Sequence, residues 1–336
     1  MRERKGENMC TCINFKTKDF YFGRNLDLEY SFGERVVITP RNYKFNLKNK
    51  AKLKTKYAIM GMATVIADYP LYADAVNDKG LCMAGLYFPG NAVYCEENEE
   101  YINIASFELI PWCLGNFSNI AELRKNLEKI NITNHAFQEK IPVAELHWMI
   151  SDEKESIVLE QTKTGIQIYE NPYGVLTNNP PFNYHDINMN NYMKISAKNP
   201  ANTFSEKVSL QPYGQGFGMF GLPGDVTPTS RFVRATFYKY NSITDEDEES
   251  SISQFFHILD SVSLIKGSVI TKENNYDMTT YSSCINATKG IYYFKTYYNN
   301  QINAVALNNQ NKNGDTLEIY ELPKKQNIQY LNKKSV

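Results

Sequence analysis

The chain has 336 residues and 42% hydrophobic content, enough for one large domain or two ordinary ones with a substantial core. Its 36 basic and 37 acidic residues nearly balance, without a polybasic arm or an acidic tail, which argues against nucleic acid or membrane surfaces as partners. No apolar run of roughly 18 residues occurs, and no apolar signal segment follows the charged opening MRERKGENM. The six cysteines are scattered and lack zinc or redox spacing, so we expect a reducing, cytoplasmic location and neither a metal nor a cofactor.

The first part of the chain is typical of β-structure. Apolar and aromatic runs bounded by turn residues predict five strands before the first helix, over residues 10–15, 20–27, 36–39, 57–66 and 80–88. The first two flank the polar turn at 16–19 and should pair as a hairpin. The third ends before Pro40, and the near-continuous apolar run of the fourth indicates a strand buried on both faces.

Helices and further strands follow. A helix is expected over 105–117, kinked or broken at Pro111. Another begins at Asn119, an N-cap with Glu122 at N3, with apolar residues continuing at helical spacing to Ile130. A third covers 251–264 after an acidic loop at 245–249. The remaining strands are predicted over 146–151, 156–162, 165–170, 278–286, 290–297, 302–307 and 317–322.

This order of elements predicts the fold class. Strands, helices, strands, one helix and strands again indicate an α+β protein with two stacked antiparallel sheets and helices outside them. No low-complexity linker or internal repeat divides the chain, so we expect a single domain over 10–330. A pure sandwich or a doubly wound sheet fits less well because the helices are few and do not alternate with single strands.

Cys10 is the candidate nucleophile. It directly follows Met9, so removal of residues 1–9, or a translation start at Met9 followed by Met excision, would give Cys10 a free α-amino group. That amine and the thiol both titrate near neutral pH, so the amine could take the thiol proton without a histidine partner. Arg24 and Asp27 on the returning hairpin strand could then hold the thiolate and the ammonium. The alternative is an ordinary buried thiol beside an ordinary ion pair.

Three more stretches could carry chemistry. The strand end GVLTNNP (174–180) offers Asn178 as an amide donor for an oxyanion, although such residues also form plain turns. The stretch 214–232 has five glycines but no phosphate-loop lysine, and we interpret it as a long loop that carries Arg231 inward. Tyr87, in AGLYFPG (84–90), lies next to a strand end and could offer its hydroxyl.

The four histidines share no metal spacing. His147 and His257 are expected to be packed or capping residues. His185 either lines a pocket mouth or lies on the surface. A metal site built on Cys10 and Cys12 would lack a second ligand pair nearby.

Taken together, Cys10, GRNLD (23–27), GVLTN (174–178) and LPGD-x-TP-x-SRF (222–232) resemble the choloylglycine hydrolase family, which contains conjugated bile salt hydrolases and penicillin V acylases. The resemblance runs from Cys10 to the last strand and includes ITPRNY, DYPLYADAVNDKGL, LHWMISD, TYSSC and GIYYFKTY. Each motif alone is weak, but all of them in this order are specific. The resemblance implies a four-layer αββα N-terminal nucleophile hydrolase fold that acts on a C–N amide bond outside peptides.

The resemblance also implies roles for single residues. Cys10 would be the nucleophile and, through its freed amine, the general base, with Arg24 and Asp27 positioning the thiolate and the ammonium. Asn178 and the backbone near Tyr87 would hold the oxyanion, and Arg231 would support Cys10 electrostatically. The family also implies a homo-oligomer, often a tetramer.

The substrate that the resemblance implies is a glycine- or taurine-conjugated bile salt. Bile salt hydrolases usually carry Asn at the position of Tyr87, whereas penicillin V acylases carry Tyr there, but the flanking segments resemble the bile salt enzymes. The alternatives are penicillin V acylase, acyl-homoserine lactone acylase and, in another class, a non-catalytic small-molecule binder that never exposes Cys10.

Overall fold

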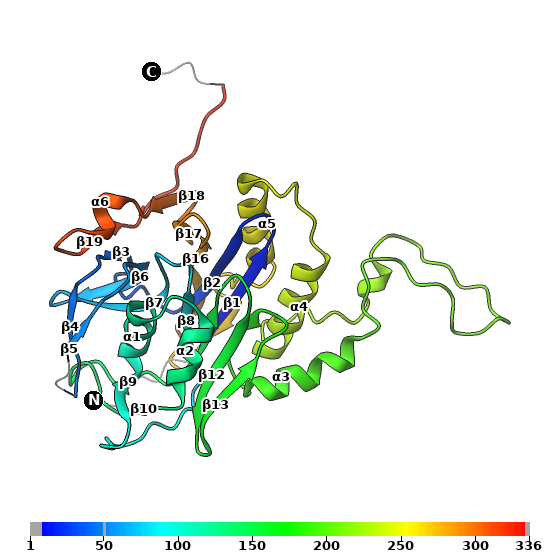
Figure 1. Ribbon diagram of the computed structural model, residues 1–336. Coiled ribbons are helices and arrows are strands. Elements are labelled where there is room, and N and C mark those ends of the chain that lie inside the picture. The colour runs from blue at the N-terminus through cyan, green and yellow to red at the C-terminus, as the bar shows by residue number, and fades with distance from the viewer. Residues whose placement is uncertain (1–8, 50–51, 333–336) are drawn as a thin grey trace.

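In the computed structural model, which describes residues 9–49 and 52–332, two large antiparallel sheets stack face to face and helices cover their outer sides (Figure 1). The layers follow the order helices, sheet, sheet, helices, so the predicted α+β fold class with two stacked antiparallel sheets is confirmed. Two short pairs lie outside the large sheets: β4 (Lys44–Asn46) with β5 (Lys52–Lys54), and β9 (Ile102–Ala105) with β10 (Ile130–Thr133).

One sheet has seven strands and contains the N-terminal hairpin. Its strand order is β14-β1-β2-β16-β17-β18, with β15 paired to β16. Its strands are β1 (Met9–Lys16), β2 (Phe20–Leu28), β14 (Val175–Leu176), β15 (Val269–Ile270), β16 (Tyr276–Asn286), β17 (Ile291–Thr296) and β18 (Asn299–Ala306). The hairpin predicted for the start of the chain is therefore confirmed, with its turn between β1 and β2.

The other sheet has eight strands in the order β13-β12-β11-β8-β7-β6-β3-β19. They are β3 (Arg35–Thr39), β6 (Ile59–Ile66), β7 (Tyr69–Asn77), β8 (Cys82–Tyr87), β11 (Leu146–Ser151), β12 (Ser156–Thr162), β13 (Gly165–Glu170) and β19 (Glu318–Glu321). Strand β6 is buried on both faces over its first five residues, as the apolar run predicted.

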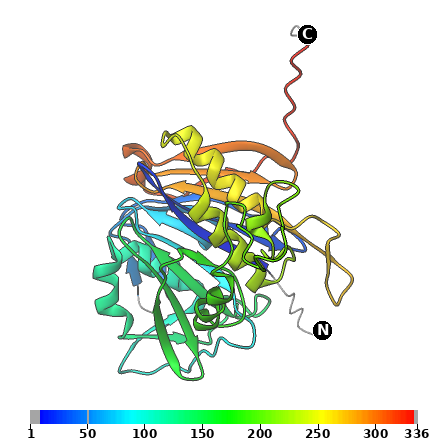
Figure 2. The same ribbon diagram turned by 90° about the vertical axis from the view of Figure 1, so that its right-hand side faces the viewer.

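Helices cover each sheet from outside. Helices α1 (Leu109–Asn116) and α2 (Ile120–Leu127) pack on the eight-stranded sheet. On the seven-stranded sheet lie α4 (Pro228–Asn241) and α5 (Glu248–Asp260), which cross in front of β1 and β2 in Figure 2. Two further helices, α3 (Phe182–Met189) and the short α6 (Asn309–Lys312), lie at the periphery.

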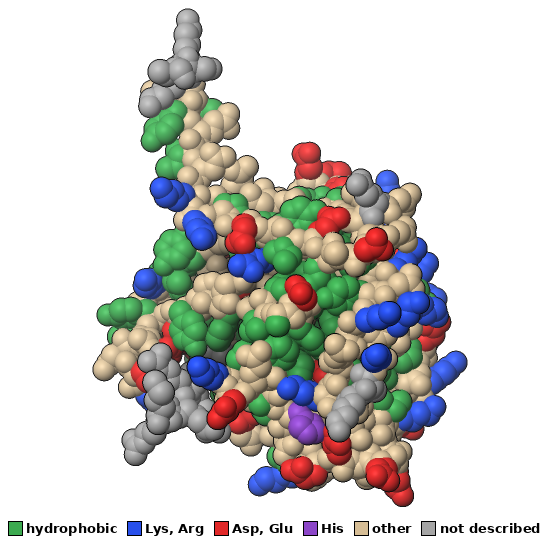
Figure 3. Space-filling view, turned by 90° about the vertical axis from the view of Figure 1, so that its left-hand side faces the viewer, with side chains coloured by type: hydrophobic (Ala, Val, Ile, Leu, Met, Phe, Trp, Pro, Cys, Tyr) green, Lys and Arg blue, Asp and Glu red, His purple; other side chains and the backbone are tan. Residues whose placement is uncertain are grey.

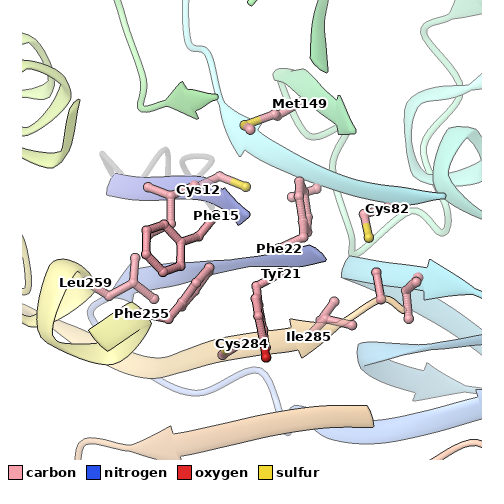
Figure 4. Packing of buried hydrophobic residues seen from close by; sticks show 14 of the residues in the cluster. Cys12, Phe15, Tyr21, Phe22, Cys82, Met149, Phe255, Leu259, Cys284 and Ile285 are labelled. Carbon is pink, nitrogen blue, oxygen red and sulfur yellow. The ribbon is translucent and has the colours of Figure 1, made fainter. Parts of the chain in front are cut away.

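The core follows from the period-2 pattern of the strands. Val36 and Ile38 point between the sheets, while Val37 between them packs on the α1 and α2 side. Figure 4 shows the two sides of β2: Phe22 points toward Cys82 of the facing sheet, and Tyr21 points to the side on which Phe255 of α5 packs. Because both faces of each sheet are covered, β1 and β2 are buried along most of their length.

Several predicted elements differ from the structure. Nine strands, not five, precede the first helix of the described chain, because β4, β5, β7 and β9 were not recognised. In β7, Asp74 interrupts the apolar pattern, and its carboxylate turns out to be buried in a polar network. The last predicted strand, over 317–322, corresponds to β19, which does not continue the sheet of β16, β17 and β18 but pairs with β3 in the eight-stranded sheet.

The helices also depart from prediction. Pro111 neither kinks nor breaks α1, because the α-helix begins only at Leu109 and proline is tolerated in a first turn. Asn119 caps α2 as predicted, accepting from Glu122 N at 2.9 Å, but the helix ends at Leu127 and Ile130 opens β10. The acidic run at 245–249 supplies the cap and first turn of α5 instead of a loop.

Two helices near the site were missed entirely. The stretch interpreted as a loop up to residue 232 is a loop only as far as Thr227, and Arg231 lies on α4. The second missed helix is α3, which begins at Phe182. Between α3 and α4, residues 193–222 form a long arm that extends away from the body in Figure 1. Among the described helices, none is long and apolar enough to cross a membrane.

Candidate active site

The β1–β2 hairpin brings Arg24 into contact with Cys10. Its register pairs Cys12 with Arg24, and the Arg24 side chain reaches along the strand so that Nη2 donates to Cys10 Sγ at 2.5 Å. Cys10 is 2% exposed with Met9 still before it, and Arg24 is fully buried. The charged guanidinium therefore lies in direct hydrogen-bond contact with the Cys10 sulfur.

Arg24 is held by the facing sheet. Its Nη1 donates to Ala73 O at 3.0 Å and to Gly85 O at 2.5 Å, on β7 and β8. Burial lowers the pKa of Arg24, but attraction to the Cys10 sulfur and other acidic groups raises it above its ordinary value overall. The arginine therefore stays charged and bridges the two sheets at the sulfur.

A buried carboxylate that the sequence did not point to lies behind Arg24. Asp74 accepts hydrogen bonds from Tyr281 Oη at 2.5 Å, Tyr292 Oη at 2.7 Å and Ser283 Oγ at 3.1 Å. Burial raises the pKa of Asp74, and Arg24 acts in the opposite direction. The one feature of the sequence that could have pointed to Asp74 is an acidic residue among apolar ones. The same pattern is equally typical of a turn or of an edge strand.

Arg231 reaches the site from α4, on the opposite side of the hairpin. Its Nη1 donates to the carbonyl oxygen of Cys10 at 2.5 Å and to Thr11 Oγ1 at 2.6 Å, while Nη2 donates to Asn178 Oδ1 at 2.8 Å. Burial lowers the pKa of this arginine, which attraction to Asp27 and Cys10 counteracts. Arg231 thus contacts the main chain of Cys10, whereas Arg24 contacts its sulfur.

Asn178 closes the site at the end of β14. Its Oδ1 accepts from the main-chain nitrogen of Cys10 at 2.8 Å, and its Nδ2 donates to the main-chain oxygen of Tyr87 at 2.8 Å. Tyr87 is the last residue of β8. The carboxamide therefore joins the nitrogen of Cys10, the guanidinium of Arg231 and the strand end at Tyr87.

Asp27 lies beside the N-terminal side of Cys10. Across the hairpin its Cα is paired with that of Met9. Its Oδ1 accepts from Thr279 Oγ1 at 2.6 Å, while Oδ2 is buried without a hydrogen-bond partner in the described structure. Burial raises the pKa of Asp27 to about 6, although Arg231, the Thr279 hydroxyl and Arg24 all lower it. One carboxylate oxygen is thus available to a cation at this position.

The two neighbouring cysteines differ in environment. Burial raises the pKa of Cys12 well above its ordinary value, although Arg24 lowers it. Cys12 is therefore an inert core thiol at neutral pH, and Cys10 is the cysteine that receives a guanidinium hydrogen bond.

The structure brings together the residues that the sequence singled out: Cys10, Arg24, Asp27, Tyr87, Asn178 and Arg231. The interpretation of the histidines was partly wrong. His147 is packed as predicted, but His185 is fully buried and His257 is exposed on α5. Among residues 9–49 and 52–332, no cluster of three or more acidic, cysteine or histidine side chains could hold a metal ion.

The two stacked sheets and the buried N-terminal hairpin define the class of the protein: it has the fold of an N-terminal nucleophile hydrolase. The family model of linear amide C–N hydrolases, choloylglycine hydrolase family, matches residues 10–320, and the chain belongs to this family. The resemblance seen in the motifs is confirmed, and the protein is an enzyme of the linear amide C–N hydrolase type.

Individual members of this family are similar to the chain over nearly its whole length. The chain is 48% identical over 322 residues to a bile salt hydrolase/transferase of Lactiplantibacillus plantarum, covering 96% of this chain and 99% of the relative. It superposes with a TM-score of 0.90 and 42% identity on a cysteine-to-alanine mutant of the conjugated bile acid hydrolase from Clostridium perfringens, covering 96% of this chain and 100% of the other. Penicillin V acylase from Agrobacterium tumefaciens shares the fold at 20% identity, with a TM-score of 0.75 and coverage of 94% and 92%.

Proposed function

We propose that this protein hydrolyses the C–N amide bond of glycine- or taurine-conjugated bile salts, releasing the free bile acid and the amino acid, with Cys10 as nucleophile. The observation that carries the proposal is a pair of hydrogen bonds at Cys10. Arg24 donates to the Cys10 sulfur, and the main-chain nitrogen of Cys10 donates to Asn178 Oδ1. The names of the relatives at 48% and 42% identity supply the substrate class.

The reaction begins with attack of the Cys10 thiolate on the substrate carbonyl carbon. A C–S bond forms, the carbonyl π-electrons move to oxygen, and Asn178 Nδ2 with the backbone near Tyr87 stabilises that oxyanion. One such donor is commonly worth about 2.7–4 kcal/mol. The Cys10 ammonium then gives its proton to the leaving nitrogen as the C–N bond breaks. Water, deprotonated by the same amine, finally cleaves the thioester.

The mechanism needs the α-amino group of Cys10 to be free. While Met9 is attached, that nitrogen is an amide without basicity, and it donates to Asn178 Oδ1. After removal of residues 1–9, Asp27 Oδ2 would pair with the ammonium, and Arg231 would hold the Cys10 carbonyl in place. The proposed organisation is thus a leader of residues 1–9 and one catalytic domain over 10–330.

The surroundings of the hairpin suit an apolar acyl group. The chain leaves β2 directly beyond Asp27 into the loop 29–34, where Tyr30 and Phe32 are half exposed and in edge-to-face contact at 4.9 Å. Thr64 Oγ1 ties this loop to β6 by donating to Phe32 O at 3.2 Å. As a separate feature, Figure 3 shows hydrophobic side chains gathered at the centre of one face of the molecule. Such surfaces match the apolar body of a sterol better than a polar substrate.

The same site could cleave penicillin V, and Tyr87 is the feature that points there. The comparisons do not favour this alternative, because the likeness to the penicillin V acylase is at 20% identity and shows the fold alone. An acyl-homoserine lactone has still less support, and a non-catalytic binder conflicts with membership of an amide hydrolase family.

The test is a paired assay on protein whose N-terminus has been verified as Cys10 by intact mass. Rates on glycocholate, taurocholate and penicillin V should favour the bile salts. Cys10→Ser should abolish turnover with an unchanged circular dichroism spectrum, and Cys12→Ala, the matched control, should keep most of it. Faster cleavage of penicillin V would replace the substrate, and turnover by Cys10→Ser would exclude the nucleophile.

We further propose a cytoplasmic homo-oligomer, a tetramer by family resemblance. The arm at 193–222 supports this assembly, because it presents large hydrophobic side chains to solvent, with Tyr213 95% and Phe220 90% exposed. A second copy of the chain would cover them.

A further inference from the structure

Two buried histidines hold the backbone that presents Asn178. Nε2 of His147 lies 3.0 Å from Thr177 O, and Nε2 of His185 lies 3.1 Å from Asn178 O. A carbonyl oxygen can only accept a hydrogen bond, so each Nε2 carries a hydrogen and donates it. Imidazole donors therefore fix two successive carbonyls at the end of β14.

Each ring also stacks beside a residue that holds the Asn178 side chain. His147 stacks on Phe88 at 4.3 Å, next to Tyr87, whose carbonyl accepts from Asn178 Nδ2. His185 stacks on Phe232 at 4.7 Å, next to Arg231, which donates to Asn178 Oδ1. The two rings thus connect the backbone of Asn178 to both partners of its carboxamide.

Glu160 orients the first ring and links it to the second. Its Oε1 lies 3.0 Å from His147 Nδ1 and accepts from Phe182 N at 3.0 Å. Glu160 is fully buried in β12, within the eight-stranded sheet. Phe182 opens α3, the helix that carries His185. Burial lowers the pKa of His185 to about 4, so this ring is neutral at pH 7 and keeps its single hydrogen for Asn178.

We propose that His147, oriented by Glu160, and His185 are positioning residues for amide hydrolysis, which clamp the 177–178 backbone so that the Asn178 carboxamide meets the oxyanion. This proposal rests on the proposed function, since it assigns the clamp to the oxyanion donor of that reaction. The rings act through Asn178, because their hydrogen bonds go to backbone carbonyls and to Glu160. Misplacement of a catalytic group by about 1 Å can cost on the order of a hundredfold in rate.

The first test compares glutamine with asparagine at each histidine. Glutamine can place an amide N–H near the position of Nε2, whereas the shorter asparagine reaches only the position of Nδ1. We expect His147→Asn and His185→Asn to lower kcat about tenfold to hundredfold with KM nearly unchanged, and His147→Gln and His185→Gln to recover most of the loss. Equal kcat values for the Gln and Asn variants would overturn the clamp.

A second readout separates positioning from general damage. Alkylation of Cys10 by iodoacetamide needs the thiolate but forms no oxyanion, so its rate should stay at the wild-type value in all four variants. A parallel fall of alkylation and hydrolysis would show that the histidines only support the fold. If the His147 variants do not fold, His185→Phe provides the test. It keeps an aromatic ring against Phe232 and leaves the contact between Glu160 and His147 in place. It should behave like His185→Asn.

A double-mutant cycle tests the route through Asn178. In the Asn178→Ala background, His185→Phe should cause little further loss of kcat, because the group that it positions is already gone. Fully additive losses would contradict the proposal.

Failure of the clamp can be told from failure of the proposed function. The chain has four histidines, so a ¹⁵N-histidine NMR spectrum is simple to assign. We expect slowly exchanging Nε2–H signals that disappear in His147→Gln and His185→Gln. If these signals are present in a protein without bile salt hydrolase activity, the proposed function is wrong. The histidine hydrogen bonds then exist, but they have no role in catalysis. If hydrolysis is present and the signals are absent, the clamp alone is wrong.

Discussion

At the scale of single residues, Asp27 shows how function competes with stability. Its pKa is about 6 in the folded chain against about 3.9 in an unfolded one, so the folded state binds this proton more tightly. Stability from Asp27 is therefore present below pH 4 and is lost as the pH rises through about 6. In the proposed mechanism, the Asp27 carboxylate pairs with the ammonium of Cys10 after residues 1–9 are removed.

The substitution Asp27→Asn should accordingly stabilise the protein and impair it. In protein that retains Met9, we expect the free energy of unfolding at pH 7 to increase by on the order of 2 kcal/mol, measured by urea denaturation. In protein that begins at Cys10 the gain should shrink, because the ammonium there pairs with the carboxylate, and hydrolysis should fall. An Asn variant that is less stable than the wild type in both forms would contradict the role of burial.

His185 has the opposite pH dependence. Burial lowers its pKa to about 4, compared with about 6.5 in an unfolded chain, so the unfolded state binds the extra proton. The stability that depends on the neutral ring is complete above pH 6.5 and is lost as the pH falls toward 4. Between these pH values, we expect the wild type to lose on the order of 3 kcal/mol relative to His185→Phe. Parallel denaturation curves for the two proteins across this range would refute the assignment.

At the scale of elements, the close approach of β2 and β16 places Arg24. A Cβ on Gly23 would lie 2.0 Å from the main-chain oxygen of Ser283, so only glycine allows the two strands to pair here. The next residue, Arg24, uses its main-chain nitrogen to donate to Ser283 Oγ at 3.1 Å. The pairing of the two strands therefore also fixes the position of Arg24.

We expect Gly23→Ala to destabilise the protein by on the order of 3 kcal/mol and to lower the rate of Cys10 alkylation, because Arg24 is displaced from the sulfur. Gly214→Ala is the matched control, since nothing lies within 4 Å of the added methyl group. It should change the free energy of unfolding by less than about 0.5 kcal/mol. A Gly23→Ala protein with normal stability and alkylation would show that the two strands can separate without cost.

The sequence predicted elements well where a pattern is local. The hairpin, the buried run of β6 and the cap at Asn119 each depend on neighbouring residues, and all three are present. The start of α4 was missed although Thr227 and Pro228 form a good N-terminus, because the glycines before them favoured a loop. The site residues came from the motifs. The contacts of Asp74 and His185 join distant segments, and no local pattern reports such contacts.

At the scale of the whole molecule, the proposed assembly can be tested separately from the proposed chemistry, because it is assigned to the arm at 193–222. Replacing Phe204, Tyr213 and Phe220 together by serine should lower the mass of the assembly in light scattering and leave the folded core intact, because these side chains are 80%, 95% and 90% exposed. An unchanged assembly would place the subunit interface elsewhere. Replacement of the exposed Ile243, which lies outside the arm, by serine is the control.

In the proposed mechanism, the sulfur and the terminal nitrogen of Cys10 act as one catalytic unit. The most direct measurement compares glycocholate hydrolysis by protein that begins at Cys10 and by protein that retains Met9, with both N-termini verified by intact mass. We expect turnover only from the form with the free amine, since an amide nitrogen has no basicity. Equal turnover by the two forms would contradict the account.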